Sequence, residues 1–249
     1  MGNSIAALLL RKLLYLYLCV ALLSCAVAHQ RAAKPAPATT SPASSAAPQS
    51  TQQQPSDRID RPTSDAYSGR LSIFEDPKRD EKLQINRVMD ILGIKEGSSV
   101  ADIGAGSGWF SVRAAKRVGT GGTVYAVEIN KDFLKHIEKR TQAENLVNIR
   151  TILGTEDDPQ LPPKSVDAVL LLKTYHEVTE PIRLLKKTRE AMRAGALLGV
   201  IDRDGKGDDH GIDRDTVIEE AERAGFRLVE QHDFVKPDNV DYFLVFRSR

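Results

Sequence analysis

Short apolar runs alternate with longer amphipathic segments from residue 98 to the end of the chain. Seven of the runs are predicted to be strands, because each is short, rich in apolar residues and bounded by glycine or polar residues. They cover residues 98–103, 123–127, 147–153, 166–172, 195–202, 226–234 and 241–246. The run Val166–Leu172 is apolar almost throughout, which is typical of a strand buried on both faces of a parallel sheet.

Between and before these strands, the apolar residues recur at the spacing of a helix. The predicted helices are 76–92, 132–140, 181–192 and 216–224. Asp76 followed by Pro77 is typical of a helix start, and Gly93 is a suitable end. Asp213 or Asp215 can cap the last helix.

This order of elements predicts the fold class. Strands that alternate with helices form a mostly parallel sheet with helices on both faces, so the class is α/β. The last two strands are joined by a short connection with no helix, which implies one antiparallel member near the C-terminus. The expected sheet has seven strands.

The first 66 residues of the 249 have a different composition from the rest. Arg11 and Lys12 precede an apolar stretch that is shorter than a spanning helix usually needs, and Ala26–Ala28 forms a small-residue cleavage site. Residues 1–28 are therefore predicted to be a signal peptide or membrane anchor. Residues 29–66, rich in Ala, Pro, Ser, Thr and Gln, are predicted to be a disordered linker, and residues 67–249 the folded domain.

Three fates of this leader are open. Cleavage after Ala28 would release a soluble product, whereas an uncleaved leader would hold the domain at a membrane. Leu22–Cys25 also resembles a bacterial lipoprotein box, with Leu23 an imperfect fit, so Cys25 is a candidate for lipidation. We expect an exported or membrane-anchored protein, periplasmic or in the envelope if bacterial, and the alternative is the cytoplasmic face of a membrane.

The composition narrows the chemistry. The formal net charge is +1 and no basic cluster is present, so nothing indicates nucleic-acid binding. Both cysteines, Cys19 and Cys25, lie in the leader, and the histidines show no ligand spacing. No metal site is expected.

The most informative motif is a glycine turn directly after the first strand, with the pattern Asp-x-Gly-x-Gly-x-Gly over residues 102–108. The dinucleotide-binding fingerprint places its third glycine five residues after the first. Trp109 occupies that position here, and Gly108 comes one residue early. A second acid, Glu128, ends the next strand about 20 residues further on, where it can accept hydrogen bonds from ribose hydroxyls.

These residues resemble the first motif of class I S-adenosylmethionine-dependent methyltransferases, which have a Rossmann-like fold. The resemblance covers about Leu71 to Arg249 and is most specific at residues 100–130. It implies S-adenosylmethionine as cofactor, with its carboxylate at the helix start after the turn, its ammonium at Asp102 and its ribose at Glu128. It also implies that the helix from Asp76 closes over the cofactor pocket. The implied cofactor-binding residues are Asp102, Gly104, Ala105, Gly106, Ser107, Gly108, Glu128, Ile129, Thr155, Glu156, Asp157 and Lys173.

The acceptor is expected beyond the carboxyl ends of the strands, where Lys173–Glu177 follows the fourth strand. We predict that His176 is the general base, with Tyr175 and Glu177 as positioning groups. The alternative is that the His-Glu pair only caps a helix. Many relatives carry an acid at the position of Lys173. The expected partner is a small-molecule acceptor, which the sequence does not identify.

Two rival functions stay open. An NAD(P)-dependent oxidoreductase would share the strand, the turn and the ribose acid, but the early third glycine and Asp102 disfavour it. A non-catalytic S-adenosylmethionine-binding envelope protein would keep Asp102 and Glu128 and lack the acceptor pocket.

Export would separate the domain from a cofactor that is made in the cytoplasm.

Overall fold

The computed structural model of the chain describes residues 57–235 and 241–249. The predicted leader, residues 1–28, and residues 29–56 of the predicted linker lie outside the described residues. Within the part that the structure describes, no helix is both long enough and apolar enough to cross a membrane.

A single seven-stranded sheet forms the centre of the domain, with the strand order β3-β2-β1-β4-β5-β7-β6. The strands are β1 Ser99–Ile103, β2 Thr123–Glu128, β3 Ile149–Leu153, β4 Val166–Leu172, β5 Met192–Arg203, β6 Phe226–His232 and β7 Asp241–Ser248. The pairs from β3 to β5 are parallel, and β7 is antiparallel to both β5 and β6. The predicted Rossmann-like sheet with one antiparallel strand near the C-terminus is confirmed.

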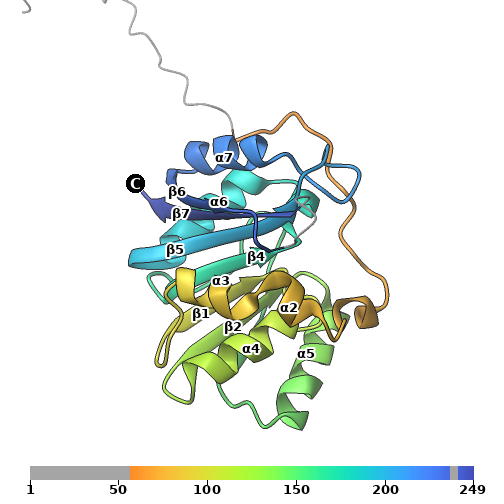
Figure 1. Cartoon of the computed structure of the whole chain (residues 1–249), viewed down its shortest axis with the longest axis vertical. Helices are drawn as coiled ribbons and strands as arrows, with labels where there is room; N and C mark the ends of the chain where they lie inside the picture. The colour runs from red at the N-terminus through yellow and green to blue at the C-terminus, as the bar shows by residue number, and fades with distance from the viewer. Residues whose placement is uncertain (1–56, 236–240) are drawn as a thin grey trace, which may run out of the picture. The chain divides into compact units, whose positions relative to one another are not determined.

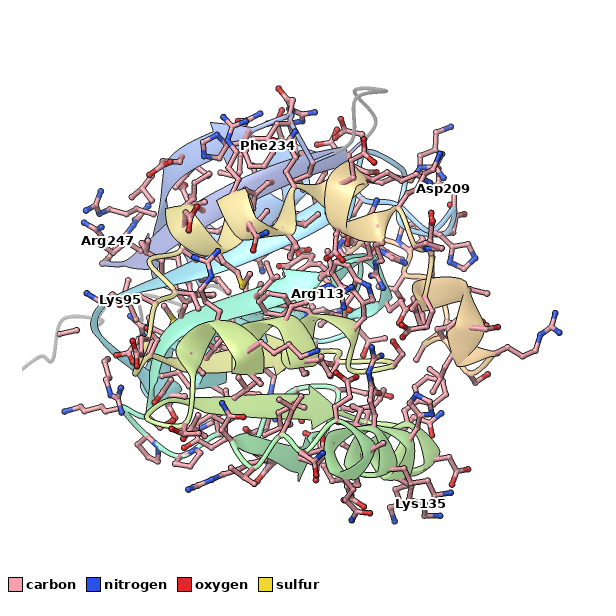
Figure 2. All side chains as sticks on the ribbon, turned by 60° about the horizontal axis from the view of Figure 1, so that its bottom comes forward. Lys95, Arg113, Lys135, Asp209, Phe234 and Arg247 are labelled. Carbon is pink, nitrogen blue, oxygen red and sulfur yellow. The ribbon has the colours of Figure 1, made fainter. Side chains whose placement is uncertain are left out.

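Helices cover both faces of this sheet (Figure 1). The helical elements of the described residues are the 3-10 turns η1 Leu71–Phe74 and η2 Tyr175–Glu177, and the helices α2 Arg79–Leu83, α3 Ile85–Ile91, α4 Trp109–Val118, α5 Lys131–Ala143, α6 Pro181–Ala191 and α7 Arg214–Arg223. The apolar residues of α3 and α4 join one core cluster, and those of α6 and α7 join the other. Figure 2 shows α3 and α4 side by side across one face of the sheet.

The leading helix, predicted to be continuous over 76–92, is divided in the structure. Asp76 accepts a hydrogen bond from the Lys78 backbone N–H at 2.8 Å and so caps the turn before α2. The chain then breaks at Gln84, which has a left-handed φ of 46°. The break allows Leu83 and Ile85 both to be buried in the same cluster, although residues two apart lie on different sides of a regular helix.

The ends of several other elements differ by a few residues from the prediction. Strand β3 begins at Ile149 and leaves Val147 exposed, whereas β5 begins early, at Met192. Asp213 is the cap of α7, since its side chain accepts hydrogen bonds from two backbone N–H groups of the first turn. These differences leave the strand order and the faces unchanged.

Residues 57–70, here called the strap, run along the edge of the sheet where the parallel strands end (orange, Figure 1). Arg61 forms a bidentate ion pair with Glu220 of α7, with N···O distances of 2.8 and 3.1 Å. Ser64 is buried, and its backbone N–H donates to the carbonyl of His176 at 3.1 Å. Composition assigned residues 57–66 to the linker, whereas in the structure these contacts hold them against the domain.

Candidate functional site

A cavity of about 560 Å³ lies at the carboxyl ends of the parallel strands, with strap residues in its wall. Most of the predicted site residues line it: Asp102, Gly104, Ala105, Gly106, Ser107, Glu128, Ile129, Thr155, Glu156, Lys173, His176 and Glu177. Gly108, Asp157 and Tyr175 do not. The structure therefore brings the predicted cofactor and acceptor groups into one space.

The three glycines of the turn serve different purposes. A Cβ atom at Gly104 would collide with the Thr174 side chain, and one at Gly108 would lie 3.1 Å from Ile137 of α5. These two positions therefore need glycine for packing, and Gly108 begins α4 as its N-cap rather than lining the cavity. Gly106 lines the cavity with a φ of 54°, and a Cβ atom at this position would have Phe74 as its nearest neighbour, at 3.5 Å. It lets a ligand approach the backbone closely.

Asp102 lies in β1 and is almost fully buried. One of its carboxylate oxygens accepts a 2.6 Å hydrogen bond from the Ser111 hydroxyl of α4. Burial raises the pKa of Asp102 to about 6, against the opposing effects of Ser111 and the Arg79 charge. A buried carboxylate on the cavity wall is suited to a cationic group of a ligand.

Glu128 ends β2, where the strand adjoins the glycine turn. Its Oε2 accepts from the backbone N–H of Gly106 at 2.9 Å, and its Oε1 accepts from those of Ile129 and Asn130 at 2.8 and 3.0 Å. The carboxylate thus holds the turn in shape. Oε2 has only one donor and therefore one acceptor site left, so Glu128 can also accept a hydrogen bond from a ligand.

Arg79, the first residue of α2, lies on the cavity wall and was not predicted from the sequence. Its guanidinium lies 4.4 Å from the centre of the Trp109 ring and donates to the Phe74 carbonyl at 2.9 Å. Burial lowers its pKa to about 10, so the group is cationic at neutral pH. The cavity therefore presents a half-buried cation close to the buried acid Asp102.

The segment before α2 is fastened to the glycine turn. Glu75 accepts hydrogen bonds from the Ser107 hydroxyl at 2.7 Å and from Arg140 of α5 at 2.6 Å. Burial opposes ionisation of Glu75, but these two donors outweigh it and lower its pKa. The predicted closure over the pocket is therefore made by η1 and α2, with Phe74 above Gly106.

The loop after β3 supplies the far wall of the cavity. Thr155 and Glu156 line it, as does Ile129, which is 43% exposed. Asp157 turns away, because its carboxylate accepts from the Thr155 hydroxyl at 2.8 Å and pairs with Arg183 at 2.7 Å. Asp157 therefore stabilises the loop, and its side chain does not line the cavity.

His176 lies in η2, just beyond β4, and is buried. Its Nδ1 is 2.9 and 3.1 Å from the two carboxylate oxygens of Asp202, which is completely buried in β5. Burial opposes protonation of His176, but the hydrogen bond and charge of Asp202 outweigh it, so the pKa of His176 is raised. The ring lines the cavity and is held by a carboxylate that does not.

The two residues on either side of His176 differ in their surroundings. Glu177 lines the cavity, accepts from the Tyr67 backbone N–H at 3.3 Å, and has its pKa raised by burial. Tyr175 points into the core instead, where its hydroxyl donates to Glu220 at 2.9 Å. The prediction that Tyr175 positions an acceptor is therefore corrected: successive side chains of this tight turn point in different directions.

Lys173 follows β4 with a left-handed φ of 57° and forms an ion pair of 2.5 Å with the buried Asp241 of β7. Many relatives carry an acid at the position of Lys173, and here the lysine is paired with an acid of β7. His210, from the loop after β5, completes this end of the cavity, with its ring centre 5.9 Å from that of His176.

Sequence reasoning missed Arg79, Asp202, His210 and the strap. Asp202 carried a usable signal, because it is an acid at the carboxyl end of an apolar strand, where ligands bind in this fold. Within the described residues, no three His, Cys, Asp or Glu side chains are arranged to hold a metal.

Part of the chain that forms this site is similar to known methyltransferases. Residues 100–195 match the family model described as a methyltransferase domain. Over 110 residues the chain is 24% identical to a demethylmenaquinone methyltransferase of Geobacillus stearothermophilus, covering 44% of this chain and 47% of that protein. Over 83 residues it is 31% identical to the nocamycin O-methyltransferase of Saccharothrix syringae, covering 33% of this chain and 30% of that protein. The chain thus spans less than half the length of both relatives.

A solved structure extends the likeness to most of the domain. The structure of a SAM-dependent methyltransferase from Aquifex aeolicus superposes with a TM-score of 0.65 at 24% identity, covering 71% of this chain and 95% of that one. This likeness shows the fold. The matched family model and both relatives are described as methyltransferases, and the Aquifex aeolicus protein is a SAM-dependent one.

Proposed function

We propose that this cavity binds S-adenosylmethionine and that the protein transfers its methyl group to a small-molecule acceptor. One observation carries the proposal: the glycine turn, Asp102, Glu128 and His176 line the same cavity. A cofactor held by the first three groups has its reactive end within a space that also contains an imidazole.

The residues present fit a zwitterionic nucleoside ligand. The buried carboxylate of Asp102 suits the ammonium of the cofactor, and the half-buried guanidinium of Arg79 suits its carboxylate. Glu128 is placed to accept from the ribose hydroxyls, and the apolar side chain of Ile129 is placed for the base. The absence of a side chain at Gly106 gives the ligand room beside the turn.

When bound, S-adenosylmethionine supplies an electrophilic methyl group on a sulfonium and leaves as S-adenosylhomocysteine. The work of the protein is to align the acceptor, exclude water and remove a proton. We assign proton removal to His176, whose Nε2 takes the proton as the heteroatom of the acceptor forms its bond to the methyl carbon. Glu177 stands 3.8 Å from this nitrogen and favours the imidazolium that results.

His176→Ala tests this assignment. We expect the turnover rate to fall roughly 10²–10⁴-fold, as for loss of a general base, with S-adenosylmethionine affinity unchanged. Turnover is measured as transfer of radiolabelled methyl to small-molecule acceptors screened with the wild-type protein. His136→Ala, on the exposed side of α5, is the matched control. Full activity in His176→Ala would leave this residue with a structural role only.

We also propose that the leader exports the chain or anchors it to a membrane, on the evidence of Arg11, Lys12 and the apolar run that follows them. Mass spectrometry of the mature amino terminus in the native host separates the three fates: cleavage after Ala28, lipidation at Cys25 or retention of Met1. Cys25→Ser should release only a lipidated form. An intact Met1 with the domain protected from external protease would contradict export and place the domain beside the cytoplasmic cofactor supply.

A further inference from the structure

Asp202 is completely buried and does not line the cavity, yet it makes more contacts with the candidate base than with any other group. Its Oδ2 accepts from the His176 backbone N–H at 3.2 Å, and both of its oxygens are within 3.1 Å of His176 Nδ1. Its Oδ1 also accepts from the Arg203 backbone N–H at 2.9 Å. A carboxylate with these three donors is a fixed acceptor, so the ring nitrogen that faces it must carry a proton.

The sheet explains why the two residues meet. Strands β4 and β5 are parallel neighbours, with Leu172 paired to Ile201, and the Lys173 N–H continues the ladder to the Ile201 carbonyl at 2.7 Å. The next residue of β5 is Asp202, and the turn after β4 folds His176 back over it. The strap fixes the other side, where Ser64 donates to the His176 carbonyl. The β4–β5 ladder on one side and the strap on the other therefore fix the backbone that carries the His176 ring.

We propose that Asp202 is the positioning residue for His176, holding the ring with Nδ1 protonated so that the Nε2 lone pair faces the cavity. This inference rests on the proposed methyl transfer and goes beyond it by naming the group that selects the tautomer. Asp202 touches neither cofactor nor acceptor and acts through His176 alone. A ring with the opposite tautomer would present an N–H to the acceptor and could not take its proton.

The charged and titratable groups around the ring come from every element that packs against it. Asp202 faces it from β5, Glu177 from η2, Lys173 from the end of β4 and His210 from the loop after β5. Asp65 of the strap lines the same cavity. After proton uptake, the imidazolium lies between the Asp202 and Glu177 carboxylates, which favour its charge, while Lys173 disfavours it.

This arrangement restricts the acceptor. A base with a free lone pair is useful only where the atom that is methylated carries a proton that it loses, such as a hydroxyl oxygen or a protonated amine nitrogen. The proton passes to Nε2, the new bond forms to the methyl carbon, and the bond from that carbon to sulfur breaks. A thioether or tertiary amine acceptor has no such proton and would not need the Asp202–His176 pair.

The tautomer can be measured without knowing the acceptor. In the ¹⁵N-histidine-labelled protein, long-range ¹H–¹⁵N spectra distinguish a protonated Nδ1 from a protonated Nε2 in a neutral ring, and His176→Gln identifies the signals. We expect His176 to be protonated on Nδ1. A neutral ring protonated on Nε2 would overturn the proposal, whatever the protein binds.

The second test is the substitution Asp202→Asn. Asp204→Asn is the matched control, since Asp204 pairs with Arg214 and does not line the cavity. In Asp202→Asn we expect a lower His176 pKa, more of the Nε2-protonated ring, and a turnover rate reduced roughly 10²–10⁴-fold with S-adenosylhomocysteine affinity within twofold of wild type. An unchanged tautomer and rate would refute the role of Asp202. Absent S-adenosylhomocysteine binding in the wild type would refute the proposed function instead. If Asp202→Asn does not fold, the His176 tautomer measured in the wild-type protein tests the proposal on its own.

Discussion

Asp102 is an acid that costs the folded protein stability and, in our account, is kept for binding. Burial raises its pKa from 3.8 to about 6. Because one pKa unit corresponds to about 1.4 kcal/mol, ionised Asp102 destabilises the folded state by about 3 kcal/mol at neutral pH. The raised pKa means that this cost is absent below pH 3.8, grows as the pH rises towards 6, and is fully present above it.

The same pKa predicts how cofactor affinity depends on pH. Only the ionised carboxylate attracts the ammonium of S-adenosylmethionine, and the ammonium and carboxylate of the ligand do not titrate between pH 5 and 7. Affinity should therefore be near its full value at pH 7 and about 10-fold weaker at pH 5, one unit below the pKa. The intrinsic fluorescence of Trp109 is a suitable assay, because this cavity residue is the only tryptophan in the chain.

Asp102→Asn separates binding from folding. The amide keeps an acceptor for the Ser111 hydroxyl but loses the charge. We expect affinity to fall by about 1.5–3 kcal/mol, the usual worth of a hydrogen bond to a charged group, and to lose its dependence on pH between 5 and 7. We expect the melting temperature at pH 7.5 to be equal or higher. A lower melting temperature with unchanged affinity would refute the reasoning, since Asp102 would then be a structural acid.

Substitutions at three further positions test other parts of the cofactor site. Glu128→Ala should weaken S-adenosylmethionine binding by about 1.5–3 kcal/mol through loss of charge-assisted hydrogen bonds; unchanged affinity by calorimetry would remove Glu128 from the site. Gly106→Val should abolish binding but leave a folded protein by circular dichroism, because a branched side chain resists the φ of 54° and enters the cavity; normal binding would show that the turn does not contact the ligand. Arg79→Ala should weaken binding about 10-fold or more, with Arg79→Lys intermediate, if the guanidinium holds the cofactor carboxylate; equal affinities in all three proteins would exclude that contact.

The strand pattern was readable from the sequence because it is local. Val166–Leu172 was predicted with the bounds that the structure shows, and the short final connection correctly implied the antiparallel β7. The break at Gln84 was not readable in the same way. It depends on contacts far along the chain, including the hydrogen bond from the Gln84 side chain to the Phe234 carbonyl at 3.0 Å.

The same distinction between local pattern and long-range contacts applies to the candidate site. The glycine turn and Glu128 lie within 27 residues of one another, so their spacing alone suggested a site. Asp202 and the strap reach His176 only through the sheet and its covering segments, which no local pattern reveals. The error at Tyr175 has a related cause, since the direction of a side chain in a 3-10 turn depends on the elements packed around it.

Ligand choice tests the central claim most directly. The purified protein is titrated by calorimetry with S-adenosylmethionine, S-adenosylhomocysteine and NAD under the same conditions at pH 7.5. We predict saturable binding of the first two at one site per chain, and no heat from NAD. Binding of NAD without S-adenosylmethionine would contradict the account and favour an oxidoreductase built on the same sheet.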